Sequence, residues 1–285
     1  MVRRSVSILS GVLLASLAGG LHGQDEEKKI GWFDTAELSL VATGGNTEAN
    51  TFSFKNALLR TFNAADLLLE AGALRAETTS FTRRVIGPSS TDFDLVEETQ
   101  TELTAESLYL RGKFSQEISD LQSWFAGLGW ERNEFAGIAN RSSLGGGVRQ
   151  RWFDNKGSKL STEYGLFLTR EGTVVAGSDE DFLALRLSWD YLRQLTKTTT
   201  FGSVLAIDEN LDVTSDFRVD TTNLIAVSIT DTLALKLSVQ LLFDNEPAFE
   251  LVEREFPEGV LSGDLVAVEL DTLDSVVTIA LVVSF

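Results

Sequence analysis

The chain has 285 residues and carries 24 lysines and arginines against 42 aspartates and glutamates, which gives a formal net charge of −18. A chain this acidic repels nucleic acid, whose binding depends on basic groups at the phosphates, so we expect no nucleic-acid partner. The chain has no cysteine, which excludes a disulfide framework and thiol chemistry.

The first residues resemble a secretory signal peptide. Arg3 and Arg4 make a basic start, and an apolar run and several small residues follow. The run is too short for a transmembrane helix. We therefore expect residues 1–23 to be cleaved on export and residues 24–285 to form one domain. Cleavage also removes His22, the only histidine. The mature chain would then lack the residues for Ser-His or Cys-His catalysis and for a histidine zinc site.

After this leader, the chain is a series of segments in which apolar and polar side chains alternate. Alternation with a period of two predicts β-strands that have one apolar face. Most of these segments are near the length of about nine to eleven residues that a tilted strand needs to cross a bilayer. In chain order they cover residues 33–43, 52–61, 67–77, 100–113, 123–131, 141–152, 160–169, 183–191, 201–207, 219–229, 233–243 and 273–285.

The links between these segments alternate in length. We expect tight turns at the short polar links, which are residues 63–66, 116–120, 154–157, 196–198 and 230–232. The other links are mostly longer and include the polar residues 78–99 and an acidic insertion at residues 245–271. Short periplasmic turns and long external loops produce this asymmetry, whereas a soluble sandwich has no reason to put its long loops at one end.

Two segments show features typical of a membrane barrel. Trp124 and Trp130 bracket an apolar middle, as expected where rings lie at the two membrane interfaces. The last segment has an apolar face from Val277 to Phe285, and such an edge promotes aggregation unless barrel closure covers it. We therefore predict an all-β chain that forms a single antiparallel up-and-down transmembrane β-barrel of about 12 strands, in which the last segment pairs with the first.

Turn and strand signatures that extend along the mature chain resemble a known family. They are Trp32, Glu37-Leu38-Ser39, Thr43 to Glu48, Trp130, Arg132, Phe135, Gly137, Ile138, Arg141, Gly145 to Gly147, Glu163-Tyr164-Gly165, Ile229 to Lys236, Asn245 and Pro247. Together they are similar to domain of unknown function 481, a Gram-negative outer-membrane barrel family often labelled salt-induced outer membrane protein. The resemblance implies a location in the bacterial outer membrane, with membrane lipid and the barrel-assembly machinery as partners. It implies no activity, because these signatures are not catalytic.

Charged residues on the predicted inner face are the candidate lumen-lining residues. They are Glu37, Lys55, Glu106, Glu131, Arg141, Arg149, Arg151, Glu163, Arg186, Asp190 and Lys236. On one interpretation, opposite charges pair across neighbouring strands and fill a narrow interior. On the other, they line a small aqueous pore and set its selectivity. Phe285, at the end of the chain, resembles the assembly signal of outer-membrane barrels.

Acidic loops form a second group of candidates. Their residues are Asp92, Asp94, Glu97, Glu98, Asp179, Glu180, Asp181, Glu250, Glu253, Glu255 and Glu258. Carboxylates bind Ca²⁺ and Mg²⁺, so divalent cations are candidate partners at these loops. None of the loops has a defined metal-binding spacing, and a solvated acidic surface is the simpler interpretation. We expect no cofactor.

The sequence favours an outer-membrane barrel that acts as a structural protein or as a narrow passive channel for ions and small solutes, without catalysis. Two alternatives stay open. One is a soluble periplasmic β-sandwich that binds a ligand, and the other is a carboxylate-dependent hydrolase, for which no pair of carboxylates is singled out.

Overall fold

The computed structural model describes residues 30–43, 47–89, 92–133, 138–173, 179–247, 249–255, 261–269 and 271–284. Its strands are β1 (Gly31–Thr43), β2 (Thr47–Thr61), β3 (Ala65–Ser89), β4 (Asp92–Ser119), β5 (Gln122–Asn133), β6 (Ile138–Asn155), β7 (Ser158–Thr173), β8 (Glu180–Gln194), β9 (Thr199–Asn210), β10 (Phe217–Ser228), β11 (Leu233–Asp244), β12 (Phe249–Glu255), β13 (Leu261–Glu269) and β14 (Leu273–Ser284). Within these ranges there is no helix long and apolar enough to cross a membrane.

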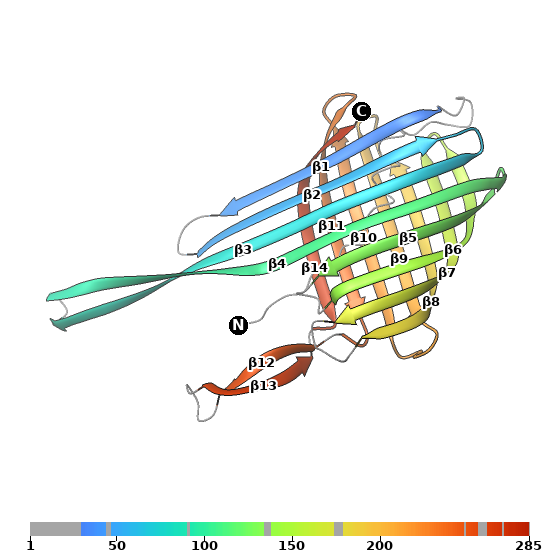
Figure 1. Cartoon of the computed structure of the whole chain (residues 1–285). Coiled ribbons are helices and arrows are strands. Elements are labelled where there is room, and N and C mark those ends of the chain that lie inside the picture. The colour runs from blue at the N-terminus through green and yellow to red at the C-terminus, as the bar shows by residue number, and fades with distance from the viewer. Residues whose placement is uncertain are drawn as a thin grey trace.

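Twelve of these strands close into one barrel (Figure 1). Each strand pairs antiparallel with its neighbours in the order β1-β14-β11-β10-β9-β8-β7-β6-β5-β4-β3-β2. The first strand meets the last, because Thr35 pairs with Ser284 and Leu38 pairs with Leu281. The prediction of an all-β, antiparallel barrel of about 12 strands is therefore confirmed.

The alternation in the sequence becomes an inside and an outside of the barrel wall. In β11 the even-numbered residues 236–242 are buried, and the odd-numbered residues 235–241 are exposed. The buried set includes Lys236 and Gln240, whereas the exposed set is entirely apolar. The wall thus places apolar side chains outside and most polar side chains inside, which reverses the pattern of a soluble protein.

The predicted short turns all lie at one end of the barrel. The links β2–β3, β4–β5, β6–β7, β8–β9 and β10–β11 are each at most four residues long. Side chains stabilise several of them: Asn155 Oδ1 accepts hydrogen bonds from the backbone N–H groups of Gly157 and Ser158 at 3.0 and 2.9 Å. Such Asx turns hold the chain in a sharp reversal. We call this the short-turn end and the opposite one the long-loop end.

Two long links contain strands that the sequence pattern did not predict. In the first of these links, residues 78–89 and 92–99 continue β3 and β4 as a ribbon that projects from the barrel (Figure 1). Beyond Ser80, β3 pairs only with β4, so no barrel wall imposes alternation there. The acidic insertion holds the separate hairpin β12–β13. Alternation appears in a sequence where one face of a strand is apolar and the other is polar. It is weak in a ribbon that lies outside the barrel wall.

Candidate functional site

The outer face of the barrel carries a belt of exposed apolar side chains, which we call the apolar belt. It includes residues from almost every barrel strand: Leu38, Leu40, Phe52, Phe54, Leu69, Leu108, Leu110, Leu128, Leu144, Leu166, Leu168, Leu185, Leu187, Ile225, Val227, Leu235, Leu237, Val239, Val277, Ile279 and Leu281. Most soluble monomers expose only small apolar patches. A belt that surrounds the molecule needs an apolar environment.

Aromatic rings lie near the short-turn end of this belt. The rings of Phe114 and Trp124 are 5.6 Å apart, and Tyr191 packs edge-on against Phe153 and Phe201 at 6.5 and 6.3 Å between centroids. Aromatic side chains concentrate where a membrane barrel crosses the interface between lipid and water.

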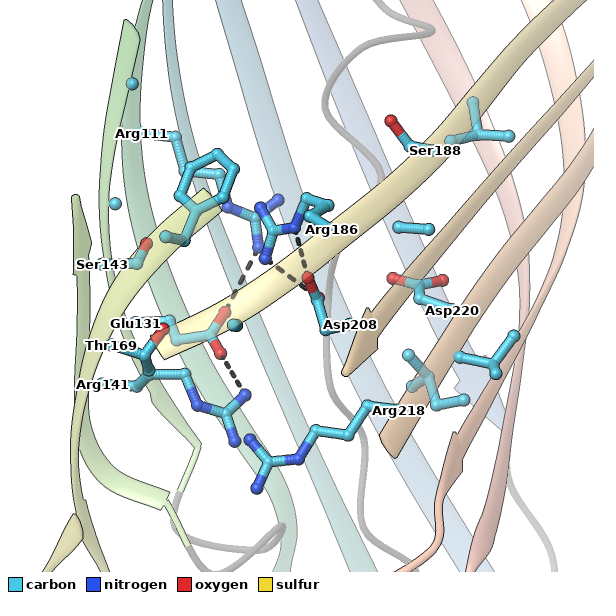
Figure 2. Close-up of a pocket in the computed structure, with 18 of the residues that line it drawn as sticks. Arg111, Glu131, Arg141, Ser143, Thr169, Arg186, Ser188, Asp208, Arg218 and Asp220 are labelled. Atoms are coloured by element: carbon cyan, nitrogen blue, oxygen red, sulfur yellow. Dashed lines mark hydrogen bonds and ion pairs between the residues drawn. The ribbon is translucent and has the colours of Figure 1, made fainter. Parts of the chain in front are cut away.

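Inside, the barrel contains a cavity of about 230 Å³, whose lining extends from the long-loop end to Leu68, Ser161 and Asp190 in the short-turn half. Its wall combines charged side chains of β4 to β8 and β10 with residues from the long-loop end, such as Pro247 and Asp271. Figure 2 shows Glu131 between two arginines, with Arg111 at 3.2 Å and Arg141 at 2.9 Å. The cavity is therefore polar and is lined by charges of both signs.

Several ion pairs cross the lumen instead of joining neighbouring strands. Glu171 of β7 accepts hydrogen bonds from Arg141 of β6 at 2.7 Å and from Arg218 of β10 at 2.9 Å. Two strands, β8 and β9, separate Glu171 from Arg218 in the wall. Lys113 of β4 donates to Glu163 of β7 at 2.6 Å across β5 and β6. These pairs bridge the interior and narrow any path along it.

Arg186 occupies the middle of the cavity wall. Its guanidinium binds both carboxylate oxygens of Asp208 at 2.6 and 2.9 Å and lies 4.5 Å from the centroid of the Phe167 ring (Figure 2). A bidentate carboxylate pair combined with an aromatic face fixes an arginine in one orientation. Arg186 is thus a rigid part of the wall.

A buried ion pair lies next to the junction of the first and last strands. Lys236 of β11 binds Glu37 of β1 across β14, and their side chains are only 7% and 3% exposed. Lys55 of β2 is the register partner of Glu37. We call Glu37 and Lys236 the seam clasp, because they join the two sides of the β1–β14 junction from inside.

The barrel interior next to the short turns is packed. Its inward-facing side chains exclude water almost completely, and Thr35, Ala57, Leu192, Ala226 and Val282 are each at most 4% exposed. Leu192 and Ala226 form a buried cluster with residues of neighbouring strands. A wide pore would leave such residues in contact with water, so the cavity does not continue here as an open channel.

The structure places the predicted lumen-lining residues in three environments. Glu131, Arg141, Glu163, Arg186 and Asp190 line the cavity. Arg149 lies beside this group, at 3.7 Å from Glu163 and 3.8 Å from Asp190. Glu37 and Lys236 form the seam clasp, and Lys55 is the register partner of Glu37. Arg151 lies at the short-turn rim, where it donates to the carbonyl oxygen of Asp120 at 3.1 Å. Phe285 lies outside the described residues.

Glu106 needs a correction. Its side chain is 40% exposed and lies 3.5 Å from Arg75, on the face of β4 opposite to the buried Ser107 and Tyr109. Placing Glu106 on the inner face puts the odd-numbered Tyr109 on the outer face, so the alternation assigned the wrong face to this part of the strand. Tyr109 turns inward because its ring covers Gly72, whose missing side chain leaves room for it.

The sequence interpretation also missed several inward charges. They are Glu70, Arg111, Lys113, Glu171, Asp208, Arg218, Asp220 and Asp244, and all but Glu171 line the cavity. Arg111 and Lys113 share a face with Tyr109, so the correct facing of β4 would have identified them. Glu171, Asp208 and Arg218 lie near strand ends, where alternation gives way to loop composition.

The acidic loops do not form a recognisable metal centre in the part of the chain that the structure describes. No group of three or more carboxylates there is arranged to hold a metal ion. Asp92, Asp94, Glu97 and Glu98 belong to the projecting part of β4, and Glu250, Glu253 and Glu255 belong to β12. Asp179, Glu180 and Asp181 lie at the start of β8, and Glu258 lies outside the described residues.

Comparison with known proteins gives one family and several structures of similar shape. The family model described as protein of unknown function, DUF481, matches residues 36–256. No curated protein matches the chain.

The solved structures that match are distant in sequence. A NanC porin structure aligns with a TM-score of 0.47 and 10% identity over 88% of this chain and 98% of that chain. The translocator domain of the autotransporter NalP from Neisseria meningitidis gives 0.45 and 10% over 96% and 94%. A KdgM porin in complex with oligogalacturonate gives 0.41 and 8% over 89% and 99%.

Proposed function

We propose that this chain, which belongs to the DUF481 family of proteins of unknown function, is a β-barrel of the bacterial outer membrane. One observation carries the proposal: the apolar belt surrounds a closed barrel whose inner face holds the charges. In lipid every backbone polar group needs a partner within the protein, and a closed barrel can meet this requirement with strands. Lipid can also cover such an apolar belt without a free-energy penalty.

The soluble periplasmic alternative fits this arrangement poorly. A β-sandwich buries its apolar faces between two sheets and exposes its charges. Here the reverse holds, since Leu237 and Val239 face outward while Lys236 is buried. A soluble form would expose the whole belt to water and would aggregate.

The glutamates in and beside the cavity fit the hydrolase alternative poorly. Glycosidase chemistry uses one carboxyl group that holds a proton and a second that stays ionised. Glu131 and Glu163 of the cavity wall instead form ion pairs with basic side chains, as does Glu171, which binds the cavity residues Arg141 and Arg218. The proposed function therefore contains no catalytic step.

In this proposal the short-turn end faces the periplasm. The cavity, the ribbon of β3 and β4 and the hairpin β12–β13 face the outside of the cell. This follows from the loop lengths, because outer-membrane barrels have short periplasmic turns and longer external loops. The packed interior next to the short turns then makes the protein a structural barrel with a vestibule that opens externally. It does not conduct ions at rest.

A gated narrow channel is the second candidate function. The cross-lumen pair Lys113–Glu163 favours it, because this pair is an obstacle formed by two movable side chains and not by backbone. Charges of both signs along the wall would suit small polar solutes once the pairs separate.

Export of the full chain in a Gram-negative host tests the membrane proposal. We expect the protein in outer-membrane fractions, where its electrophoretic mobility should change on heating as a folded barrel unfolds. Recovery in the soluble periplasmic fraction would overturn the proposal. Planar-bilayer recording then separates the two functions, since the structural barrel gives no conductance steps. Steps in the wild type, or steps that appear in Lys113→Gln alone, would favour the channel.

A further inference from the structure

The junction between β1 and β14 is much shorter than the other junctions of the barrel. Four residue pairs join these strands, from Thr35–Ser284 to Leu38–Leu281. By contrast, eleven pairs join β14 to β11 and thirteen join β1 to β2. Among the described residues, no pair joins residues 275–280 of β14 to β1. The long-loop half of this junction is therefore unpaired, and we call it the open seam.

Side-chain exposure shows the same separation. Leu40 of β1 is 71% exposed and Val277 of β14 is 67% exposed, the two highest values among the exposed large apolar residues. Both belong to the apolar belt on either side of the open seam. The next contact beyond the four pairs comes from a side chain. The Ser39 hydroxyl donates a hydrogen bond to the carbonyl oxygen of Ile279 at 2.7 Å. The two strands diverge from this point (Figure 1).

The inner row of β14 connects the cavity with the open seam. Asp274 lines the cavity, and Val276 and Thr278 follow it on the same face and are only half-buried. Their register partners on β11 are Leu242, Gln240 and Ser238, and Leu242 also lines the cavity. After Asp274 this row is uncharged up to Val282, unlike the inner rows of β4 to β8. An apolar chain can lie along it without displacing a charge.

An unpaired strand edge is costly in lipid, where no water replaces the missing hydrogen bonds. An edge next to a polar cavity avoids this cost, because water in the cavity or the head group of a ligand can reach its backbone groups. The open seam thus combines three properties: an apolar outer rim, an uncharged inner row and a polar cavity behind them. An amphiphile matches this arrangement, because its acyl chain is apolar and its head group is polar.

We propose that the open seam is a lateral portal through which the acyl chain of a lipid-like amphiphile passes between the external leaflet and the cavity. The polar head group lies in the cavity, and the acyl chain lies along the inner row of β14. This inference rests on the proposed membrane location. The seam clasp and the four residue pairs close the junction below the portal, so that the barrel stays intact while the portal is open.

Photolabelling of the wild-type protein tests this proposal. The probe is a stearate that carries a diazirine on its acyl chain, in phospholipid vesicles that contain the refolded barrel. Mass spectrometry then locates the labelled residues. We expect label on Val276 and Thr278 of the inner row in addition to Val277 and Ile279 of the outer rim. Label on the outer rim without label on the inner row would overturn the portal.

A disulfide across the seam provides the matched comparison, because the chain has no cysteine of its own. Ser39→Cys with Ala280→Cys extends the junction by one position beyond the pair Leu38–Leu281. Ser39→Cys with Ser53→Cys is the control, since these residues are register partners on β1 and β2 and their disulfide leaves the seam free. We expect oxidation of the first pair to reduce inner-row labelling at least fivefold and reduction to restore it, whereas the control pair keeps the wild-type level. Equal labelling in both oxidised variants would contradict the portal.

The two proposals fail in different ways. If no residue of the apolar belt is labelled, the barrel is not in the bilayer and the proposed function fails. If the belt is labelled around the barrel but the inner row of β14 is not, the membrane location stands and the portal fails. If the seam instead pairs with a strand of a second molecule, the inner row stays unlabelled and dimers appear, which also overturns the portal.

Discussion

At the scale of single residues, the seam clasp gives a stability prediction. Glu37→Gln removes the negative charge that binds Lys236 and leaves this buried lysine without its carboxylate partner. Removing one partner of a buried ion pair costs about 3–5 kcal/mol, because the remaining charge stays uncompensated. Urea unfolding of the barrel refolded in detergent micelles should show a loss of this size.

Glu106→Gln is the matched control for this prediction. It makes the same chemical change at a side chain that is 40% exposed and forms an ion pair with the exposed Arg75. Exposed ion pairs contribute about 0–1 kcal/mol, so we expect a change below about 1 kcal/mol. An equal loss of stability in Glu37→Gln and Glu106→Gln would show that the stabilising effect of the seam clasp does not come from its burial.

The inner face could be predicted wherever alternation was regular. In β7 and β11 the alternation correctly assigned Glu163 and Lys236 to the interior. In β4 it failed, since Tyr109 is a large aromatic residue that faces inward. The reason lies on the neighbouring strand, where Gly72 provides the space that the Tyr109 ring fills. Such complementary packing between two strands cannot be recognised from the alternation of either strand alone.

At the scale of elements, close approach of β6 and β7 gives a second prediction. A Cβ at Gly147 would lie 1.9 Å from the carbonyl oxygen of Tyr164, so Gly147→Ala must push the two strands apart. Overpacking of this kind costs about 1–3 kcal/mol. The measurement is urea unfolding under the same conditions as above.

Gly157→Ala is the control for this substitution. Gly157 lies in the turn between the same two strands, and its nearest neighbour to an added Cβ is Asn155 Oδ1 at 3.6 Å. This is an ordinary van der Waals distance, so we expect the unfolding midpoint to stay close to that of the wild type. If Gly147→Ala is equally harmless, the strands have more freedom than the structure shows.

The strands and tight turns of the barrel wall could be predicted because the physical causes are local. Alternation follows from a wall with two different faces, and turns follow from residues such as Asn155 and Gly157. The ribbon of residues 78–89 and 92–99 and the hairpin β12–β13 have no such wall. Their strands depend on pairing with one partner only, and the sequence gives that pairing no periodic signal.

At the scale of the whole molecule, closure depends on contact between residues almost the full length of the chain apart. The sequence predicted that the last strand meets the first, and Thr35 pairs with Ser284. It did not predict that only four pairs make this junction. The extent of the junction depends on the tilt of β1 relative to β14, which is a property of the closed wall and not of either strand.

This short junction makes the end of the chain important for assembly. Ser284, the last residue of β14, pairs with Thr35, and its backbone N–H also donates to the carbonyl oxygen of Thr232 at 3.0 Å. Phe285 follows directly and resembles the assembly signal of outer-membrane barrels. We predict that deleting Phe285 lowers the amount of heat-modifiable barrel in outer-membrane fractions several-fold. Deleting residues 24–27, which precede the first strand, should leave that amount close to the wild-type level. Equal assembly of the two deletion variants would show that closure does not depend on this end of β14.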